Sequence, residues 1–347
     1  MRSLLRYTRS AVSRAKNNIR LGLSHYRARL SPCRSLARVS LYDDFNVLVP
    51  KSSRVMRLAT GFRFVEGPVW IADEHCLLFT DIPANQILRY RLPAEACGKG
   101  SWFKPNITVF RYPSGHANGQ TLDVSGNLIC CEHSHRRVTV TDRSDRLTVL
   151  ADEYEGMALN SPNDVVVSRA GHLYFSDPAY GISPEQQEQP VQGVYRIDAN
   201  SGVLTREIDD IIGPNGLAFS PNEHCLYIVD SSYKRHIRMF DVDSSGHLSG
   251  GRVFARLDSS AESGPDGLKV DTQGNVYCAA QGGIWVFNSH GTHLGIITLP
   301  EKPSNCAWGG SDLNYLYITA QTSIYRVKLC TRGIGTRVIA TKQQLAQ

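Results

Sequence analysis

The sequence predicts an all-β protein, a six-bladed β-propeller with a central channel, from three observations. The 347-residue chain is 41% hydrophobic, with 29 glycines, 16 prolines and 15 tyrosines spread along it, a composition that favours strands and turns. Almost no helical periodicity follows residue 45. Most directly, one hairpin-like phrase recurs six times at intervals of 39 to 52 residues. Repeats of this length that are built from strands are typical of propeller blades.

The first 42 residues differ in charge from the rest of the chain. They hold nine arginines and one lysine without an acid, a charge of +10, so the remainder carries 6 − 10 = −4. We expect residues 1–42 to form a basic N-terminal extension, disordered or cleavable, and residues 43–340 to form the propeller. The segment lacks the apolar core of a secretory signal. We expect a cytoplasmic protein. For residues 1–42, the alternatives are a mitochondrial import signal if the host is a eukaryote, an over-long start if it is a bacterium, or a solvated charged tail without a targeting role.

Charge and hydropathy also exclude some partners. A mildly acidic body without a basic stripe argues against a nucleic-acid partner. No stretch reaches the roughly 20 apolar residues that a membrane-spanning helix needs. Nine cysteines without a Cys-x-x-Cys pair, several of them in apolar runs, predict free thiols in a reducing compartment. The oligomeric state is not predicted.

Each repeat begins with a polar residue and continues as a short apolar strand, a turn rich in Gly, Asp, Asn or Pro, and a β-branched or aromatic strand. The second strand ends 14 or 15 residues after the first letter in every copy. Strand-like pieces between the repeats, such as GVYRID at 193–198, complete four strands per blade. The copies, in order, are EGPVWIADEHCLLFTD from Glu66, NGQTLDVSGNLICCE from Asn118, NDVVVSRAGHLYFSD from Asn163, NGLAFSPNEHCLYIVD from Asn215, DGLKVDTQGNVYCAA from Asp266 and NCAWGGSDLNYLYITA from Asn305.

The first residues of the six repeats should lie close together in space, because a propeller places the start of every innermost strand around one channel. Turn formation explains asparagine beside glycine, but it does not explain Glu66. Two acids and four amides without His or Cys form a set of oxygen donors that suits a hard divalent cation. Ca²⁺ is the first choice, with Mg²⁺, Mn²⁺ or Zn²⁺ as alternatives. Such a cation polarises a carbonyl or phosphoryl oxygen and positions water, which predicts hydrolysis of an ester-like bond.

Six motifs in this order resemble the SMP-30/gluconolactonase (regucalcin-like) family over about Ser40 to Leu329: EGPVW at Glu66, SPNDVVV at Ser161, DPAYG at Asp177, GPNGLAFSP at Gly213, GPDGLKVD at Gly264 and EKPSN at Glu301. The resemblance implies a six-bladed propeller with one divalent cation in its channel. It implies Glu66, Asn215 and Asp266 as metal ligands, with Asn163 as a fourth ligand or a substrate contact. It also implies that Asp266 is the catalytic base in the opening of a sugar lactone.

Further contacts to a small-molecule lactone are expected from residues near the channel mouth, namely Asn118, Asn163, His116 and Tyr180. His116 and His133 are alternatives to Asp266 as the base, because a cation lowers the proton affinity of a carboxylate that binds it. A structural role is the alternative for both histidines, and aromatic packing is the alternative for Tyr180.

A second acid recurs at the end of four hairpins, and we expect it to be structural, because strand-end carboxylates commonly accept backbone N–H bonds. These acids are Asp81, Glu132, Asp177 and Asp230. A second metal site is not expected, since the chain continues Gly267, Leu268, Lys269 where some relatives have a further acid. Two other functions stay open: a phosphotriesterase that uses the same ligands, and a non-catalytic calcium-binding or interaction propeller.

Overall fold

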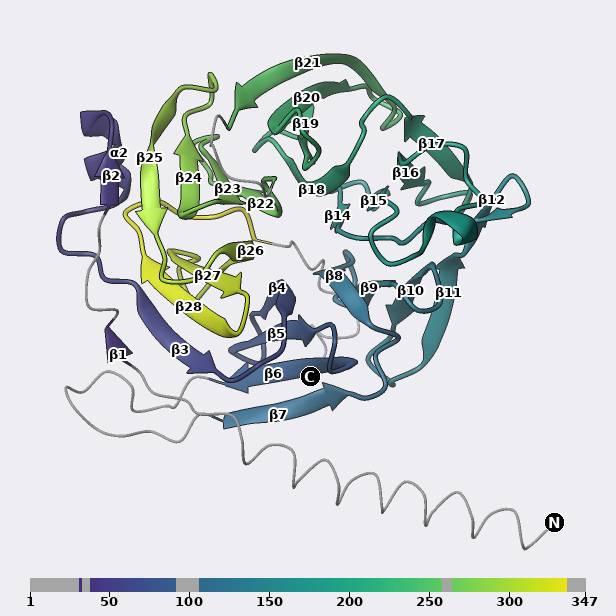
Figure 1. Cartoon of the computed structure of the whole chain (residues 1–347), viewed down its shortest axis with the longest axis horizontal. Coiled ribbons are helices and arrows are strands. Elements are labelled where there is room, and N and C mark those ends of the chain that lie inside the picture. The colour runs from purple at the N-terminus through teal and green to yellow at the C-terminus, as the bar shows by residue number, and fades with distance from the viewer. Residues whose placement is uncertain (1–30, 33–37, 92–105, 258–263, 336–347) are drawn as a thin grey trace, which may run out of the picture.

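The computed structural model describes residues 31–32, 38–91, 106–257 and 264–335. Its strands form six antiparallel sheets of four or five strands, arranged radially around a central axis (Figure 1). Helical structure in this part of the chain is confined to α2 (Asp43–Leu48) and the short 3₁₀ helix η2 (Pro184–Gln186). The predicted six-bladed β-propeller is confirmed.

Each of the first four blades consists of four strands that are consecutive in the sequence, with the first strand innermost. Their bounds are β4 (Val65–Ile71), β5 (Cys76–Asp81), β6 (Gln86–Arg91) and β7 (Asn106–Arg111); β8 (Ala117–Leu122), β9 (Leu128–Glu132), β10 (Arg137–Thr141) and β11 (Leu147–Ala151); β14 (Val165–Val167), β15 (Leu173–Asp177), β16 (Gly193–Ile197) and β17 (Leu204–Ile208); and β18 (Pro214–Phe219), β19 (Cys225–Asp230), β20 (His236–Val242) and β21 (Leu248–Arg256). A small hairpin, β12 (Glu153–Tyr154) and β13 (Met157–Ala158), links the second and third blades.

The last two blades take strands from the N-terminal part of the chain. The fifth holds β22 (Leu268–Val270), β23 (Val276–Ala280), β24 (Gly283–Phe287) and β25 (His293–Thr298), and β2 (Arg38–Ser40) pairs with the outer edge of β25. The sixth holds β26 (Pro303–Gly309), β27 (Tyr315–Ala320) and β28 (Ser323–Lys328), followed outward by β3 (Met56–Thr60) and β1 (Ser31–Pro32).

The antiparallel pairing of β3 with β28 joins the two ends of the chain and closes the ring. Strands β1 and β2 fall within the segment for which we expected an extension, and both add to blade edges. Residues 1–30 and 33–37 of that segment lie outside the described residues. The targeting role of the segment therefore stays a prediction.

The core lies between the blades. The buried apolar residues of the described chain form six clusters, and each cluster spans one pair of neighbouring blades. At the closure, Leu58 of β3 packs with Phe79 of β5 and with Trp70 of β4, whose ring stacks on Tyr317 of β27 at 5.2 Å between centroids. Closing the ring therefore buries both faces of every blade.

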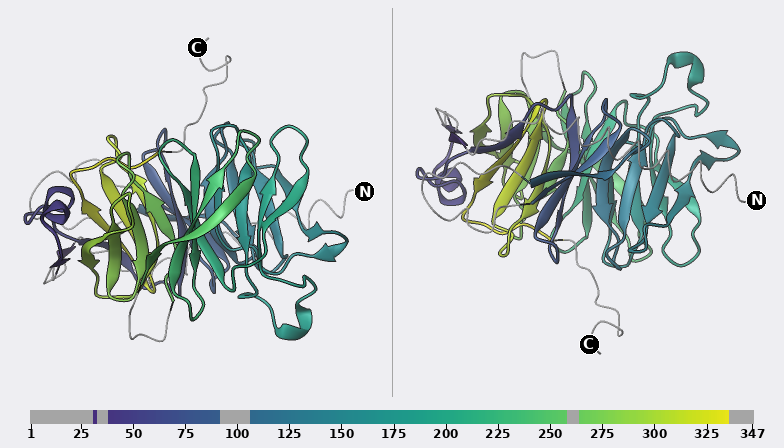
Figure 2. Two further views of the ribbon diagram at one scale, coloured as in Figure 1. Left: turned by 90° about the horizontal axis from the view of Figure 1, so that it is seen from above. Right: turned by 90° about the horizontal axis from the view of Figure 1, so that it is seen from below.

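Viewed from the edge, the molecule is a disc whose strands run across its thickness (Figure 2). Each inner strand begins on one face, called here the site face, which also carries the loop between β15 and β16 with η2. No helix within the described ranges is long and apolar enough to cross a membrane. Seven cysteines lie in these ranges and all are free thiols, in agreement with the sequence prediction.

Candidate metal-binding active site

All six first letters of the repeats lie where an innermost strand begins. Glu66 and Asn118 are the second residues of β4 and β8, Asn215 is the second residue of β18, and Asn305 is the third residue of β26. Asn163 and Asp266 each precede their strand, β14 or β22, by two residues. Five of these side chains are buried and Asp266 is half-buried. We call the six residues the channel ring.

Contacts between blades hold the channel ring together. Asn305 Nδ2 donates to Glu66 Oε2 at 3.1 Å, and it lies 3.4 Å from Asp164 Oδ2 on the opposite side of the channel. The Asn215 side chain lies close enough to the Asp266 carboxylate to lower its pKa. The Gly119 backbone N–H donates to the Asn163 carbonyl at 2.7 Å. Residues from every blade therefore meet at one level of the channel.

Glycine at the second position of four repeats makes this convergence possible. A Cβ added at Gly267 would lie 2.1 Å from the side chain of Asn305, and one at Gly216 would lie 2.6 Å from the Cα of Gly267. The inner strands thus approach too closely for a second side chain. At this level of the channel, therefore, each of these repeats contributes the side chain of its first residue and none from its second.

Asp164 is a site residue that the sequence analysis missed. It occupies the second position of the third repeat, where four other repeats have glycine, and that exception is the signal that could have revealed it. Asp164 is buried; its Oδ1 accepts the Val165 N–H at 2.9 Å, and its Oδ2 lies 3.9 Å from Lys269 Nζ. The channel therefore holds three carboxylates rather than two.

Burial and neighbouring negative charges raise the pKa of two of the three carboxylates, Glu66 and Asp266. Burial raises the pKa of Glu66 well above its ordinary value, and the charges of Asp266 and Asp164 raise it further. Burial also raises the pKa of Asp266 to about 7, with a smaller contribution from Asp164, against the opposing effects of Lys302 and the Asn215 hydrogen bond. The channel thus concentrates negative charge where little water can screen it.

This donor set fits a hard divalent cation. Within the described ranges, no group of three or more His, Cys, Asp and Glu side chains is placed to hold a metal by itself. A cation bound in the channel would draw on the Glu66 and Asp266 carboxylates together with amide oxygens such as those of Asn163 and Asn215. An all-oxygen set of this kind favours Ca²⁺, Mg²⁺ or Mn²⁺ over Zn²⁺. A cation there would also offset the repulsion among the three acids.

The remaining predicted residues lie around the channel mouth. Asn118 Nδ2 lies 3.2 Å from Nε2 of His133. His116 is turned to a different partner, Ser134 Oγ, 2.5 Å from its Nδ1. Tyr180 is 48% exposed; its hydroxyl donates to the Gly213 carbonyl at 3.3 Å and hydrogen-bonds Asn215, which places it beside the ring.

The strand-end acids hold the segments that lead into the ring. Asp81 accepts the backbone N–H groups of Arg63 and Phe64 at 3.0 and 3.2 Å, three and two residues before Glu66. Asp177 does the same for Asn160 and Ser161 at 2.7 and 2.8 Å, ahead of Asn163. These two acids are structural, as expected, and hold the chain that enters the blade. Asp230 also accepts the Ser232 N–H at 3.0 Å in the turn that follows its hairpin, as the sequence predicted.

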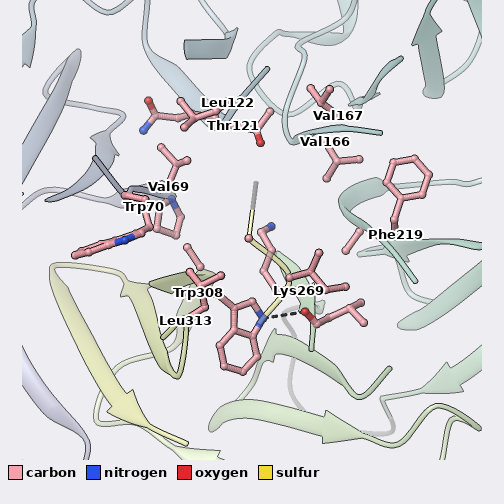
Figure 3. A pocket seen from close by; sticks show the side chains of 18 of the residues that line it. Val69, Trp70, Thr121, Leu122, Val166, Val167, Phe219, Lys269, Trp308 and Leu313 are labelled. Atoms are coloured by element: carbon pink, nitrogen blue, oxygen red, sulfur yellow. Dashed lines mark hydrogen bonds between the residues drawn. The ribbon is translucent and has the colours of Figure 1, made fainter. Parts of the chain in front are cut away.

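The other end of the channel is mainly apolar, although Arg169, Glu223 and Lys269 also line it. A cavity of about 450 Å³ is lined there by residues further along the inner strands, among them Val69, Leu122, Val166 and Phe219 (Figure 3). Trp308 forms part of its wall and donates its indole N–H to the Val270 carbonyl at 2.9 Å. The cavity holds no member of the channel ring, so the polar site and the apolar cavity occupy opposite ends of one channel.

Comparisons with known proteins show the family of this chain. The family model described as "SMP-30/Gluconolactonase/LRE-like region" matches residues 64–322. A gluconolactonase of Zymomonas mobilis is 32% identical over 83% of this chain and 85% of its own length. The pentonolactonase XacC of Haloferax volcanii is 28% identical over 75% of this chain and 82% of its own length. The structure of XC5397, a gluconolactonase from Xanthomonas campestris, superposes with a TM-score of 0.77 at 28% identity, covering 87% of this chain and 98% of that one. The chain belongs to the SMP-30/gluconolactonase/LRE-like family.

Proposed function

We propose that this protein is a divalent-cation-dependent lactonase that hydrolyses a sugar lactone in the channel ring. The observation that carries the proposal is the convergence of Glu66, Asp266 and amide side chains at the mouth of a channel, in a chain 32% identical to a gluconolactonase. Glu66, Asn163, Asn215 and Asp266 would hold the cation. When bound, it would polarise the lactone carbonyl and lower the pKa of the carboxylates that bind it.

The residues of the chain supply proton transfer and orientation. Asp266 would accept a proton from the water whose oxygen attacks the carbonyl carbon. Breaking the bond between that carbon and the ring oxygen would release an alkoxide, which takes the proton from Asp266 and leaves an open hydroxy acid. The neighbouring Asn215 side chain, which lowers the pKa of Asp266, would orient its carboxylate. Asn118, Asn163 and Tyr180 would orient the substrate at the mouth.

A substrate panel with two variants tests this proposal. Purified protein is assayed in Ca²⁺ with glucono-1,5-lactone, with unsubstituted δ-valerolactone and with a phosphotriester. We expect lactone turnover that falls by about 100-fold or more in Asp266→Asn, the scale of a lost general base. Glu66→Gln should abolish the same activity by weakening the cation site. Asp241→Asn, at an exposed position of β20 in the fourth blade where the carboxylate pairs with Arg252, is the control and should leave turnover unchanged.

The panel also separates the alternatives. Turnover of the phosphotriester alone would replace the lactonase by a phosphotriesterase on the same ligands. A wild-type protein that binds Ca²⁺ and hydrolyses neither class would instead support a binding propeller. Full activity in Asp266→Asn would contradict its role as base.

A further inference from the structure

Lys269 lies where the polar and the apolar ends of the channel meet. It belongs to β22 of the fifth blade and follows Asp266 by three residues. Its side chain is one of those that line the apolar cavity (Figure 3), whereas its Nζ lies 3.9 Å from Asp164 Oδ2 of the third blade. Lys269 therefore brings a positive charge from the cavity wall to the carboxylates of the channel.

The cations around the channel differ in what they pair with. The three carboxylates of the channel, called here the channel acids, belong to Glu66, Asp164 and Asp266. Among the described residues, Lys269 is the only Lys or Arg that forms an ion pair with a channel acid. Arg169, which also lines the cavity, pairs instead with Glu223 at 3.6 Å. Lys302 lowers the pKa of Asp266 but acts from farther away, without an ion pair in the described chain.

The Lys269 ammonium is held inside the channel. Its Nζ donates to the Leu268 carbonyl at 2.9 Å. The Lys269 side chain is 24% exposed and that of Asp164 is 4% exposed, so little water screens the two charges from each other or from an ion in the channel. The ammonium therefore contributes to the electrostatic potential in which a cation would bind.

The charges of the channel acids and of Lys269 balance one divalent cation. When ionised, the three acids carry three negative charges, and the ammonium offsets one of them, which leaves two. Without the ammonium, the same acids would balance a trivalent ion. The repulsion between Lys269 and a bound ion grows with the charge of that ion, so Lys269 disfavours a trivalent ion more than a divalent one.

We propose that Lys269 is a charge-selecting residue, which pairs with Asp164 and makes the channel select divalent over trivalent cations. The inference rests on the proposed function, because the cation concerned is the one on which lactone hydrolysis would depend. Lys269 would act through the charge of the site, without touching the cation or the substrate. Removing its charge should change the ion selectivity, and removing one acid as well should restore it.

Calorimetric titration of the chelator-stripped, full-length protein with Ca²⁺ and with Tb³⁺ tests this role without requiring turnover. Tb³⁺ resembles Ca²⁺ in size and in its preference for oxygen ligands, so the ratio of the two affinities reports mainly on charge. We expect Lys269→Met to raise the affinity for Tb³⁺ relative to Ca²⁺ by about tenfold. Lys269→Arg keeps the charge and should keep the wild-type ratio. Combining Lys269→Met with Asp164→Asn again leaves two negative charges and should return the ratio to the wild-type value.

Lys328→Met is the matched control. Lys328 is exposed on β28, where its Nζ lies 5.7 Å from the centre of the Tyr315 ring, outside the channel, so the ratio should be unchanged. Thermal unfolding of each variant checks the fold. If Lys269→Met does not fold, Asp164→Asn alone, which leaves one negative charge, must lower the ratio below that of wild type.

The outcomes separate this role from the lactonase. A wild-type ratio in folded Lys269→Met, or a double variant that keeps the ratio of Lys269→Met, would overturn the role of Lys269 and leave the lactonase unaffected. The expected ratios without lactone hydrolysis would support the role of Lys269 and contradict only the lactonase. A wild-type protein that binds neither ion would contradict both.

Discussion

At the scale of single residues, the site depends on the polar side chain at the first position of each repeat. It also depends on the glycine, which has no side chain, at the second position of four repeats. The first letter of each repeat varies among Glu, Asp and Asn, and this variation sets the charge of the channel. The glycine that follows in four repeats lets neighbouring backbones touch. Asp164 is the exception and adds a third carboxylate opposite Asn305. The charge of the channel is therefore set by the positions at which the six repeats differ from one another.

Replacing Gly267 with alanine tests this close packing. The new Cβ would collide with the Asn305 amide, which would lose its hydrogen bond to Glu66. We expect Ca²⁺ to bind about tenfold more weakly, since overpacking costs roughly 1–3 kcal/mol. The measurement is calorimetric Ca²⁺ titration.

Gly202→Ala is the control. Its Cβ would meet nothing within 4 Å, although the left-handed φ of +69° makes the substitution unfavourable for stability. A loss of stability with unchanged Ca²⁺ affinity is expected there. Equal Ca²⁺ affinities in Gly267→Ala and wild type would show that the contact between the two strands does not position the site.

At the scale of elements, each hairpin both forms a blade and positions the site. The first strand delivers a ring residue, and the acid that ends the second strand binds the backbone just before that residue in the first and third blades. The repeat pattern predicted the strands, the ring positions and the structural nature of these acids. It did not predict the partners of His116 or His133, because side-chain contacts between loops have no period in the sequence.

Asp177, the last residue of β15, makes the free energy of unfolding depend on pH. Its carboxylate is fully buried, and burial raises its pKa to about 7, against backbone hydrogen bonds that lower it. The folded pKa therefore exceeds the unfolded value of about 4. The protonated carboxyl therefore contributes fully to the free energy of unfolding below about pH 4, and this contribution is lost as the pH rises toward 7.

The variant Asp177→Asn does not titrate and isolates this effect. We expect the Tm of wild type to fall relative to that of Asp177→Asn between pH 4 and pH 7, and the difference to level off above that range. Thermal unfolding followed by circular dichroism at several pH values measures it. A difference that is constant with pH would mean that Asp177 is ionised throughout.

At the scale of the whole molecule, closure of the ring fixes the channel. The composition and the six repeats predicted a propeller, because a closed ring of six such hairpin units buries both faces of every blade. They did not identify the strand that completes the sixth blade, since β3 lies before the first repeat and pairs with β28 more than 260 residues later. Nor did they reveal that β1 and β2 extend two blade edges, because short strands at a charged terminus carry no alternating pattern.

Closure predicts that a single substitution in β3 weakens the whole protein. Leu58 is 1% exposed and packs with residues of β4, β5 and β27. Leu58→Ala should lower the free energy of unfolding by about 2–4 kcal/mol in one cooperative urea transition. Val203→Ala, at a 55% exposed position, should change it little. An early partial transition in Leu58→Ala would show that β3 can detach while the other blades stay folded.

The central claim is that the channel ring holds one divalent cation on which lactone hydrolysis depends. The most direct measurement strips wild-type protein with a chelator and follows glucono-1,5-lactone hydrolysis during titration with Ca²⁺, Mg²⁺, Mn²⁺ and Zn²⁺. We predict that activity disappears on chelation and returns with one equivalent of cation per chain, most effectively with an oxygen-preferring ion. Full activity in the chelated protein would contradict the claim.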